Sequence, residues 1–446
     1  MVVVALAILM FCVQIQHSTL GNECHPCSCQ CRSKSHPKPC INCYKRNLKF
    51  IPKFPLNLTT TIRTLTAWNN LITTLENDTF LNFTKLQWLA LGNNKIQRIE
   101  SEAFRHLINL KRLYLSGNQI TNISSTTFVG LKKLKQLHLS GNSLKTIENH
   151  TFIHLDNLEK LELDNNEIID ISSNVFTGLA SLKSLSMSRN NIQTIKSSTF
   201  CNLVALENLW MWGNKISNVA GNAFYGLQRL KKLKLNFNKL EKLRKRALDD
   251  LLRLEYLDLS HNSITALKEP FNDLLSLVKL KLANNVISNI SRMTFAKLKN
   301  LDKLELHSNR LQTIPEAFWI SGFTDVTLWL QRNPFICKCR TINQMKHLGY
   351  RVRHLRPSPG YIEKKCPNVI SVCEDERNFA LGMNLVSARG YGWFDLFNRL
   401  NIVDGNPDTF GYYYRSLSRL QLIIELPGIF FPFSEFSILL HECPLK

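Results

Sequence analysis

The sequence predicts an α/β solenoid with a parallel β-sheet along its concave face. Three observations lead to this fold class: a pattern LxxLxLxxNx(I/L) that returns twelve times between Ile62 and Asn333, a usual spacing of 24 residues, and a Phe after most copies. The repeats begin at Ile62, Leu86, Leu110, Leu134, Leu158, Leu182, Leu206, Leu230, Leu254, Leu277, Leu301 and, in degenerate form, Asp325. Regular units of this length indicate one long stack rather than the two or three globular domains that 446 residues would otherwise suggest.

Each repeated side chain has a physical task. The alternating leucines of LxLxL have a period of two, so each repeat is expected to begin with a short strand that pairs in parallel with its neighbours. The Leu and Ile side chains should point inward, because a single 24-residue unit cannot bury its own apolar face. An Asn at the ninth position, from Asn70 to Asn333, offers donors and an acceptor to backbone that is buried where the chain turns. The Phe side chains should fill the convex side.

These motifs resemble the leucine-rich repeat, whose units stack into a horseshoe. The resemblance implies that residues 59–333 form the repeats and that the sheet lines the concave face. It also implies a cysteine cap at each end of the solenoid.

The N-terminal residues 1–21 are typical of a secretory signal peptide. Met1 to Val13 are almost wholly apolar, and small residues stand at Thr19 and Gly21, although no Lys or Arg precedes the apolar run. The apolar run is too short to span a bilayer. We therefore expect a secreted protein, or one on the extracellular face of the plasma membrane.

Six cysteines crowd into residues 22–58: Cys24, Cys27, Cys29, Cys31, Cys40 and Cys43. One interpretation is a metal site, because CHPCSCQC and CINC have plausible ligand spacing. The favoured one is a disulfide-bonded cap, because an oxidising compartment favours disulfides and the first repeat would otherwise expose a strand edge and an open core. The run INCYKRNLKFIP resembles the N-terminal cap of extracellular leucine-rich repeat proteins. The pairing of the six stays open.

At the other end, NPFICKCR resembles the opening of the C-terminal cap of the same class, placed at residues 334–375. The resemblance implies that Cys337 and Cys339 pair with Cys366 and Cys373. We expect Cys201 to be a packed free thiol. Cys443, in the tail, has no disulfide partner assigned from the sequence. The tail, residues 376–446, resembles no known domain, and Glu and Pro within its apolar stretch make a membrane-spanning helix an unfavourable interpretation.

No catalytic motif accompanies the repeats, so we expect a binding protein and not an enzyme. The formal net charge is +22, and the segment from Gln228 to Arg246 holds nine basic residues against one acidic. Dense basic charge outside the cell favours binding to sulfated glycosaminoglycans of the heparan sulfate kind, to anionic microbial surfaces or to nucleic acid; the alternative is that the charge only keeps the protein soluble. The candidate polyanion-binding residues are Lys231, Lys232, Lys234, Arg244, Lys245 and Arg246.

Aromatic side chains at the outward strand positions suggest a recognition surface. Rigid rings bury much area at little entropic cost, and for that reason Trp and Tyr are enriched in binding hot spots. The candidate ligand-binding residues are Trp88, Tyr114, Trp210, Trp212, Lys234 and Tyr256. We expect a protein ligand around repeats six to nine, with the two Trp of one strand as anchors.

Glycosylation signals point to the same face. Six N-x-S/T sequons occur, at Asn57, Asn77, Asn82, Asn122, Asn149 and Asn289. The five within the repeats all fall after the predicted strand, so glycans on them would leave the concave sheet bare.

The resemblance extends to the ectodomains of Toll-like receptors, to Slit-type guidance proteins and to the variable lymphocyte receptors of jawless vertebrates. It implies binding of proteins, glycans or microbial molecules on the concave face, without a cofactor, in an innate-immune or adhesive role. The alternative is a matrix protein of the small leucine-rich proteoglycan kind, which binds other matrix components.

Overall fold

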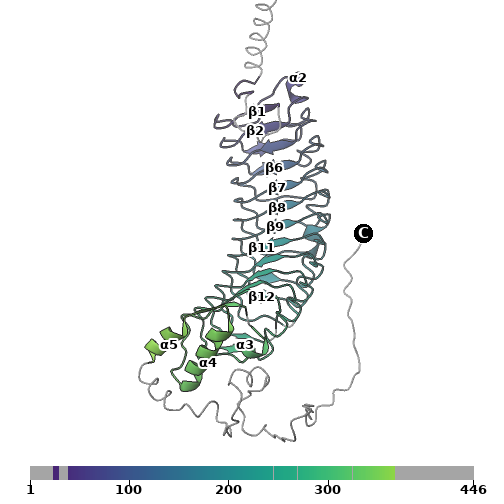
Figure 1. Ribbon diagram of the computed structural model, residues 1–446. Coiled ribbons are helices and arrows are strands. Elements are labelled where there is room, and N and C mark those ends of the chain that lie inside the picture. The colour runs from purple at the N-terminus through teal and green to yellow at the C-terminus, as the bar shows by residue number, and fades with distance from the viewer. Residues whose placement is uncertain (1–23, 30–38, 245, 269, 324, 367–446) are drawn as a thin grey trace, which may run out of the picture. The chain divides into compact units, whose positions relative to one another are not determined.

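The computed structural model describes residues 24–29, 39–244, 246–268, 270–323 and 325–366. These residues form one solenoid of stacked turns (Figure 1). Some of the sequence predictions lie outside the described residues: the signal peptide 1–21, Cys31, Lys245, Cys373, Cys443 and the tail 376–446.

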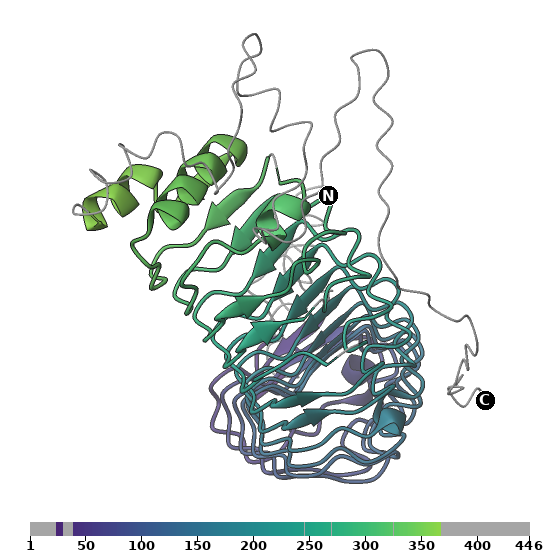
Figure 2. The same ribbon diagram turned by 90° about the horizontal axis from the view of Figure 1, so that it is seen from below.

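A parallel sheet of fourteen strands runs along one side of the described solenoid, as the view along the stack shows (Figure 2). Its strands are, in spatial order, β1 (Cys40–Asn42), β2 (Thr64–Thr66), β4 (Trp88–Ala90), β6 (Arg112–Tyr114), β7 (Gln136–His138), β8 (Lys160–Glu162), β9 (Ser184–Ser186), β11 (Asn208–Trp210), β13 (Lys232–Lys234), β14 (Tyr256–Asp258), β16 (Lys279–Lys281), β18 (Lys303–Glu305), β19 (Thr327–Trp329) and β20 (His354–Arg356). The predicted parallel-strand solenoid is therefore confirmed.

The opposite side of each repeat is made mainly of turns. Three pairs of two-residue strands lie within it: β3 (Thr74–Leu75) with β5 (Arg98–Ile99), β10 (Thr194–Ile195) with β12 (Asn218–Val219), and β15 (Ala266–Leu267) with β17 (Asn289–Ile290). The described helices are α2 (Leu56–Thr59), the 3-10 helix η1 (Ser173–Phe176), α3 (Ala317–Ile320), α4 (Cys339–Arg351) and α5 (Pro359–Lys365).

The core consists of the repeated apolar positions. The strands pair in register, so that Leu209 lies opposite Leu185 and Leu233, and all three side chains are fully buried. Phe rings stack from repeat to repeat behind the sheet, with centroids 5.9 Å apart for Phe80 and Phe104. No repeat could bury these side chains alone, so the core exists only between neighbours.

The ninth-position asparagines form the expected ladder. The side-chain amide of Asn118 donates to the carbonyl oxygens of Leu91, at 3.0 Å, and Leu115, at 2.9 Å. Its side-chain oxygen accepts from the backbone N–H of Ile96 at 3.1 Å. One asparagine thus satisfies backbone groups of two successive turns.

Both ends contribute a strand that the repeat pattern did not predict. Strand β1 pairs with β2, and an antiparallel bridge between Ser28 and Asn42 lies on its other side. Strand β20 pairs with β19 at the far end. The sheet therefore has two strands more than the twelve repeats account for.

Disulfides stabilise both ends. Cys24 bonds to Cys29 and Cys27 to Cys43. Cys40 is disulfide-bonded as well, so five of the six N-terminal sulfurs are not free to act as thiolate metal ligands. Among the described residues no group of three or more His, Cys, Asp or Glu could hold a metal ion.

At the C-terminal end Cys337 bonds to Cys366, as the resemblance implied, and Cys339 is disulfide-bonded. The bond joins Cys337, two residues before α4, to Cys366, the residue after α5. The free-thiol expectation for Cys201 is wrong, because its sulfur is disulfide-bonded. The expected burial is correct at 8% exposure, but burial alone does not distinguish a thiol from a disulfide.

We predict that replacing Cys337 and Cys366 together with Ser lowers the melting temperature and exposes the last repeats to protease. Loss of a native disulfide from a small secreted domain costs about 2–5 kcal/mol, and a terminal repeat has only one neighbour to support it. Calorimetry and limited proteolysis of the secreted protein measure both effects. The Arg340→Ala variant, which changes an exposed residue of α4, serves as the control. Unchanged melting would contradict the prediction.

Candidate binding surface

Alternation along each strand divides its side chains between the core and the sheet surface. In β11, Leu209 is buried, whereas Asn208 and Trp210 on either side are half-buried and point outward. Counting from the first residue of each repeat, positions three, five and seven therefore form three columns along the sheet. We call this outward side the sheet face.

Four rings from repeats one to four pack against one another on the sheet face. The ring of Tyr114 lies 5.4 Å from Trp88, 6.1 Å from Trp68 and 4.3 Å from His138. We call Trp68, Trp88, Tyr114 and His138 the N-terminal ring cluster. Gly92 permits the arrangement, because a Cβ on it would lie 2.2 Å from the indole of Trp68.

The N-terminal ring cluster changes the interpretation of Trp88 and Tyr114. Both are half-buried, the rings stack on each other, and the guanidinium of Arg112 lies 4.8 Å from the indole of Trp88. Burial raises the pKa of the Tyr114 hydroxyl. Much of the ring area counted as a candidate binding surface thus serves contacts between repeats.

A charged group continues this cluster into repeat five. Nδ1 of His138 lies 2.5 Å from a carboxylate oxygen of Glu162, and the ammonium of Lys160 lies 2.5 Å from the other oxygen. The hydrogen bond to His138 is the main cause that lowers the pKa of Glu162 to about 2, and Lys160 adds to it. Glu162 is therefore ionised over the whole physiological range.

Trp210 and Trp212 lie in the middle of the sheet. Trp210 stands between Ser186 of β9 and Lys234 of β13, its partners in register. Within the described residues no other ring stacks on it, and its buried indole N–H donates no hydrogen bond. Trp212 follows β11, and the guanidinium of Arg189 lies 4.6 Å from its ring. Both indoles are half-buried, so each retains accessible area.

Tyr256 lies one strand beyond Lys234. Its hydroxyl donates to Asp258 at 3.1 Å, and the ammonium of Lys279 lies 5.9 Å from its ring. Burial, and then the negative charge of Asp258, raise the pKa of Tyr256. The structure thus brings Trp210, Lys234 and Tyr256 onto three adjacent strands, with Trp212 two residues after the first of them. Trp88 and Tyr114 belong to the separate N-terminal ring cluster.

The candidate polyanion residues are divided between two sides of the solenoid. Lys232 and Lys234 lie in β13, and Lys231, just before it, pairs with Glu207 at 3.0 Å. Arg244 and Arg246 follow on the far side of the repeat, where Arg246 pairs with Asp249 at 3.2 Å. Lys245 lies outside the described residues. Adjacency in sequence therefore does not give one continuous basic patch.

All six sequon asparagines are exposed. None lies in the fourteen-stranded sheet; Asn289 lies in β17, on the opposite side of the repeat. The expected bare sheet face is compatible with this placement.

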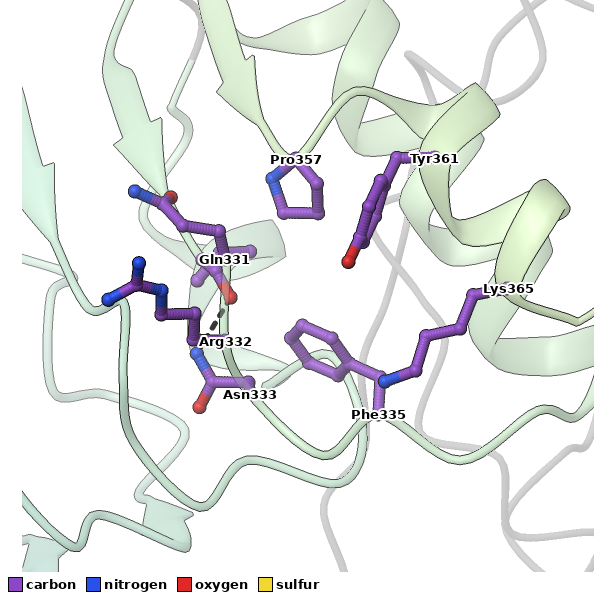
Figure 3. A pocket seen from close by; sticks show the side chains of 8 residues that line it. Gln331, Arg332, Asn333, Phe335, Pro357, Tyr361 and Lys365 are labelled. Carbon is purple, nitrogen blue, oxygen red and sulfur yellow. Dashed lines mark hydrogen bonds between the residues drawn. The ribbon is translucent and has the colours of Figure 1, made fainter.

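A small cavity of about 280 Å³ lies between the last repeat and α5 (Figure 3). The rings of Phe335, Pro357 and Tyr361 surround it, and Lys365 and Arg332 line it. It is slightly smaller than ordinary small-molecule sites of roughly 300–1,000 Å³. None of the predicted ligand-binding residues lines it.

Comparison with known families decides the class of protein. The leucine rich repeat family model matches residues 60–120, 108–168, 156–216, 205–264 and 268–319, which together make up more than half of the chain. The chain belongs to the leucine-rich repeat family. A search of curated proteins finds no match.

Solved structures share the fold of this leucine-rich repeat protein. An internalin from Listeria monocytogenes is 26% identical with a TM-score of 0.53, and the match covers 67% of this chain and 82% of the internalin. A chain in the octameric complex of latrophilin 3, Unc5D and FLRT2 (LRR) is 24% identical with a TM-score of 0.57, covering 74% and 91%. A chain of the Drosophila Toll–Spatzle complex is 21% identical with a TM-score of 0.57; the match covers 71% of this chain and 46% of the other.

Sequence reasoning missed several residues that shape the sheet face. Trp68, His138 and Glu162 stand at outward positions, and Arg189 stands one residue beyond them. The repeat numbering alone could have identified these positions. Among the described residues no helix is both long and apolar enough to cross a membrane.

We predict that Glu162→Gln destabilises the protein at pH 7 and that the difference disappears near pH 2. The folded-state pKa lies below the usual 4.5, so the carboxylate contributes stability above pH 4.5 that is lost as the pH falls toward about 2. A shift of this size corresponds to at most ~3 kcal/mol. Melting temperatures of both proteins between pH 2 and 7 measure it. Glu167→Gln, an exposed residue 4.0 Å from Lys145, is the control. A difference independent of pH would contradict this assignment.

Proposed function

We propose that this protein is an extracellular recognition module, secreted or held at the cell surface, whose sheet face binds a protein, glycan or microbial ligand around repeats six to nine. The observation that carries the proposal is the position of Trp210 on the sheet face. Its indole is outward, free of other rings among the described residues, and next to Trp212 and Lys234. Innate-immune or adhesive binding is the role that we favour.

Three further observations support this function. The disulfides suit an oxidising compartment, and the exposed sequons all lie off the sheet face. Fourteen strands at about 4.8 Å spacing give a sheet face of roughly 60 Å, ample for the ~800 Å² that each partner buries in an ordinary interface. Structures of the same fold occur in complexes with protein partners, as in the FLRT2 and Toll–Spatzle assemblies.

We predict that Trp210→Ala with Trp212→Ala weakens ligand binding by well over ~2 kcal/mol while the fold stays intact, as truncation of hot-spot aromatics does. Arrays of extracellular proteins, glycans and microbial surfaces identify the ligand, and titration compares the variants. Trp88→Ala is the matched control, because Tyr114 and Arg112 already cover that indole.

A glycan provides an independent test of the face. Ser184→Asn creates the sequon Asn-Leu-Ser on β9, directly beside β11. A glycan at this site should abolish binding, whereas a glycan at the natural site Asn122 should leave ligand binding unchanged. If both the double Trp variant and the glycosylated S184N protein bind like the parent, the ligand uses another face.

A second proposal concerns polyanions of the heparan sulfate kind. Lys232, Arg244 and Arg246 are exposed and Lys234 is half-buried, so repeat eight carries accessible basic side chains on both of its sides. We predict that the protein elutes from heparin at a salt concentration that falls when all six candidate residues are changed to Ala, because exposed charge pairs are screened by salt. The half variants K232A/K234A and R244A/R246A should each give part of the shift. Equal elution of the six-residue variant and the parent would show that these charges serve only solubility.

A further inference from the structure

The residue at position eight of every repeat has a left-handed backbone. The twelve positions have φ between 51° and 70°: Asn69, Asn93, Gly117, Gly141, Asn165, Arg189, Gly213, Phe237, His261, Asn284, Ser308 and Arg332. The backbone N–H at this position donates to the next repeat, as from Phe237 to the carbonyl of Ser260 at 3.0 Å. The turn that closes each strand thus requires this conformation.

Seven of the twelve residues are Asn or Gly, the types that adopt it most readily. Phe237 is the least suited of the others, because a bulky side chain is a genuine outlier at positive φ. The residue is 52% exposed, so packing into the core does not account for a Phe at this position. Strain of this kind persists only where the surrounding structure over-determines the backbone, and it clusters at functional sites.

Phe237 belongs to a row along the edge of the sheet face. Its ring stacks on His261 in the next repeat, with centroids 4.0 Å apart. Two repeats earlier, Arg189 in the same column lies over Trp212. Arg189, Trp212, Phe237 and His261 therefore form what we call the edge row, beside Trp210 and Lys234.

The charged side chains at the outward positions beside the edge row are all basic in repeats six to eight. In repeats six to eight, positions three, five, seven and eight carry Arg189, Lys232 and Lys234 but no Asp or Glu. Within the described residues neither lysine is within ion-pair distance of a carboxylate. Asp258, the register partner of Lys234 on β14, instead accepts hydrogen bonds from Tyr256 at 3.1 Å and from the Ser260 hydroxyl at 2.6 Å. A partner that covers these cations must supply the negative charge itself.

We propose that the edge row extends the recognition surface and, with Lys232 and Lys234, accepts a protein segment that carries both acidic and aromatic side chains. This inference rests on the proposed function and names the chemistry of its ligand. A sulfated glycan would satisfy the lysines, but it gives no reason to keep an exposed Phe in a strained backbone. An acidic segment with aromatic side chains uses both features.

The probe is a fluorescein-labelled peptide of about twelve residues, with four Glu and two Phe in a Gly and Ser background. One counterpart replaces Glu with Lys, and another replaces Phe with Ser. In anisotropy titrations with the full secreted protein, each counterpart should bind at least about tenfold more weakly than the acidic aromatic peptide. Equal binding of the Lys peptide would overturn the assigned chemistry.

The decisive variant is Phe237→Asn, with Ser308→Asn as the matched control in the same column. We expect F237N to melt no lower than the parent, because Asn suits the left-handed backbone, and to bind the acidic aromatic peptide about tenfold more weakly. S308N should leave peptide binding unchanged. If F237N melts lower and binds the peptide normally, Phe237 is structural and the inference is wrong.

Two further comparisons separate this inference from its alternatives. If heparin displaces the peptide and F237N has no effect on peptide binding, the surface is a glycan site and the inference is wrong. If W210A weakens binding but F237N does not, the proposed function stands without the edge row. Loss of peptide binding in F237N and in K232Q/K234Q, with normal binding by W210A, supports the edge row and counts against Trp210 as an anchor.

Discussion

Hydrogen bonds from the ninth-position asparagines hold successive turns of the solenoid together, and the positions of the strands and of the sheet face depend on them. The amide of Asn214 donates to the carbonyls of Met187 and Met211, and its oxygen accepts from Ile192, so one side chain joins two turns of backbone. Repeated along the chain, this linkage keeps successive strands in register and stacks equivalent positions into columns. Residues 24 apart become neighbours, as Glu162, Ser186 and Trp210 are across β8, β9 and β11. A recognition surface built from single residues of many repeats depends on that register.

The repetitive part of the fold was predictable because each of its positions has the same neighbours. Period-two leucines gave the strands, and the Asn and Phe columns gave the ladder and the core behind it. Strands β1 and β20 were not predictable, because neither Cys40–Asn42 nor His354–Arg356 carries the repeat pattern. Their positions follow from the edge of the adjacent strand, whose backbone groups need partners. Cysteine pairing was likewise only partly predictable, since spacing does not say which sulfurs meet.

The sheet face was predictable in outline but not in detail. Alternation placed Trp210 and Tyr256 outward, and they are outward. It could not show that Tyr114 would cover Trp88, or that Lys279 would lie against Tyr256, because these contacts depend on rotamers chosen in the next repeat. Charge was the least predictable feature. Lys234 and Arg246 are twelve residues apart, about half a turn of the solenoid, which places them on opposite sides.

The two aromatic regions of the sheet differ in what their position allows. Repeats near the N-terminal end have fewer turns beyond them for support, and there the rings of Trp68, Tyr114 and His138 pack across repeats. Repeat seven has neighbours on both sides, with complete ladders and core contacts, so Trp210 is not needed to hold the stack together. A half-buried indole without a stacking partner among the described residues and a strained Phe237 are tolerable in the middle, because the surrounding register over-determines the backbone. The stable interior of the stack is therefore where the sheet face can be given over to binding.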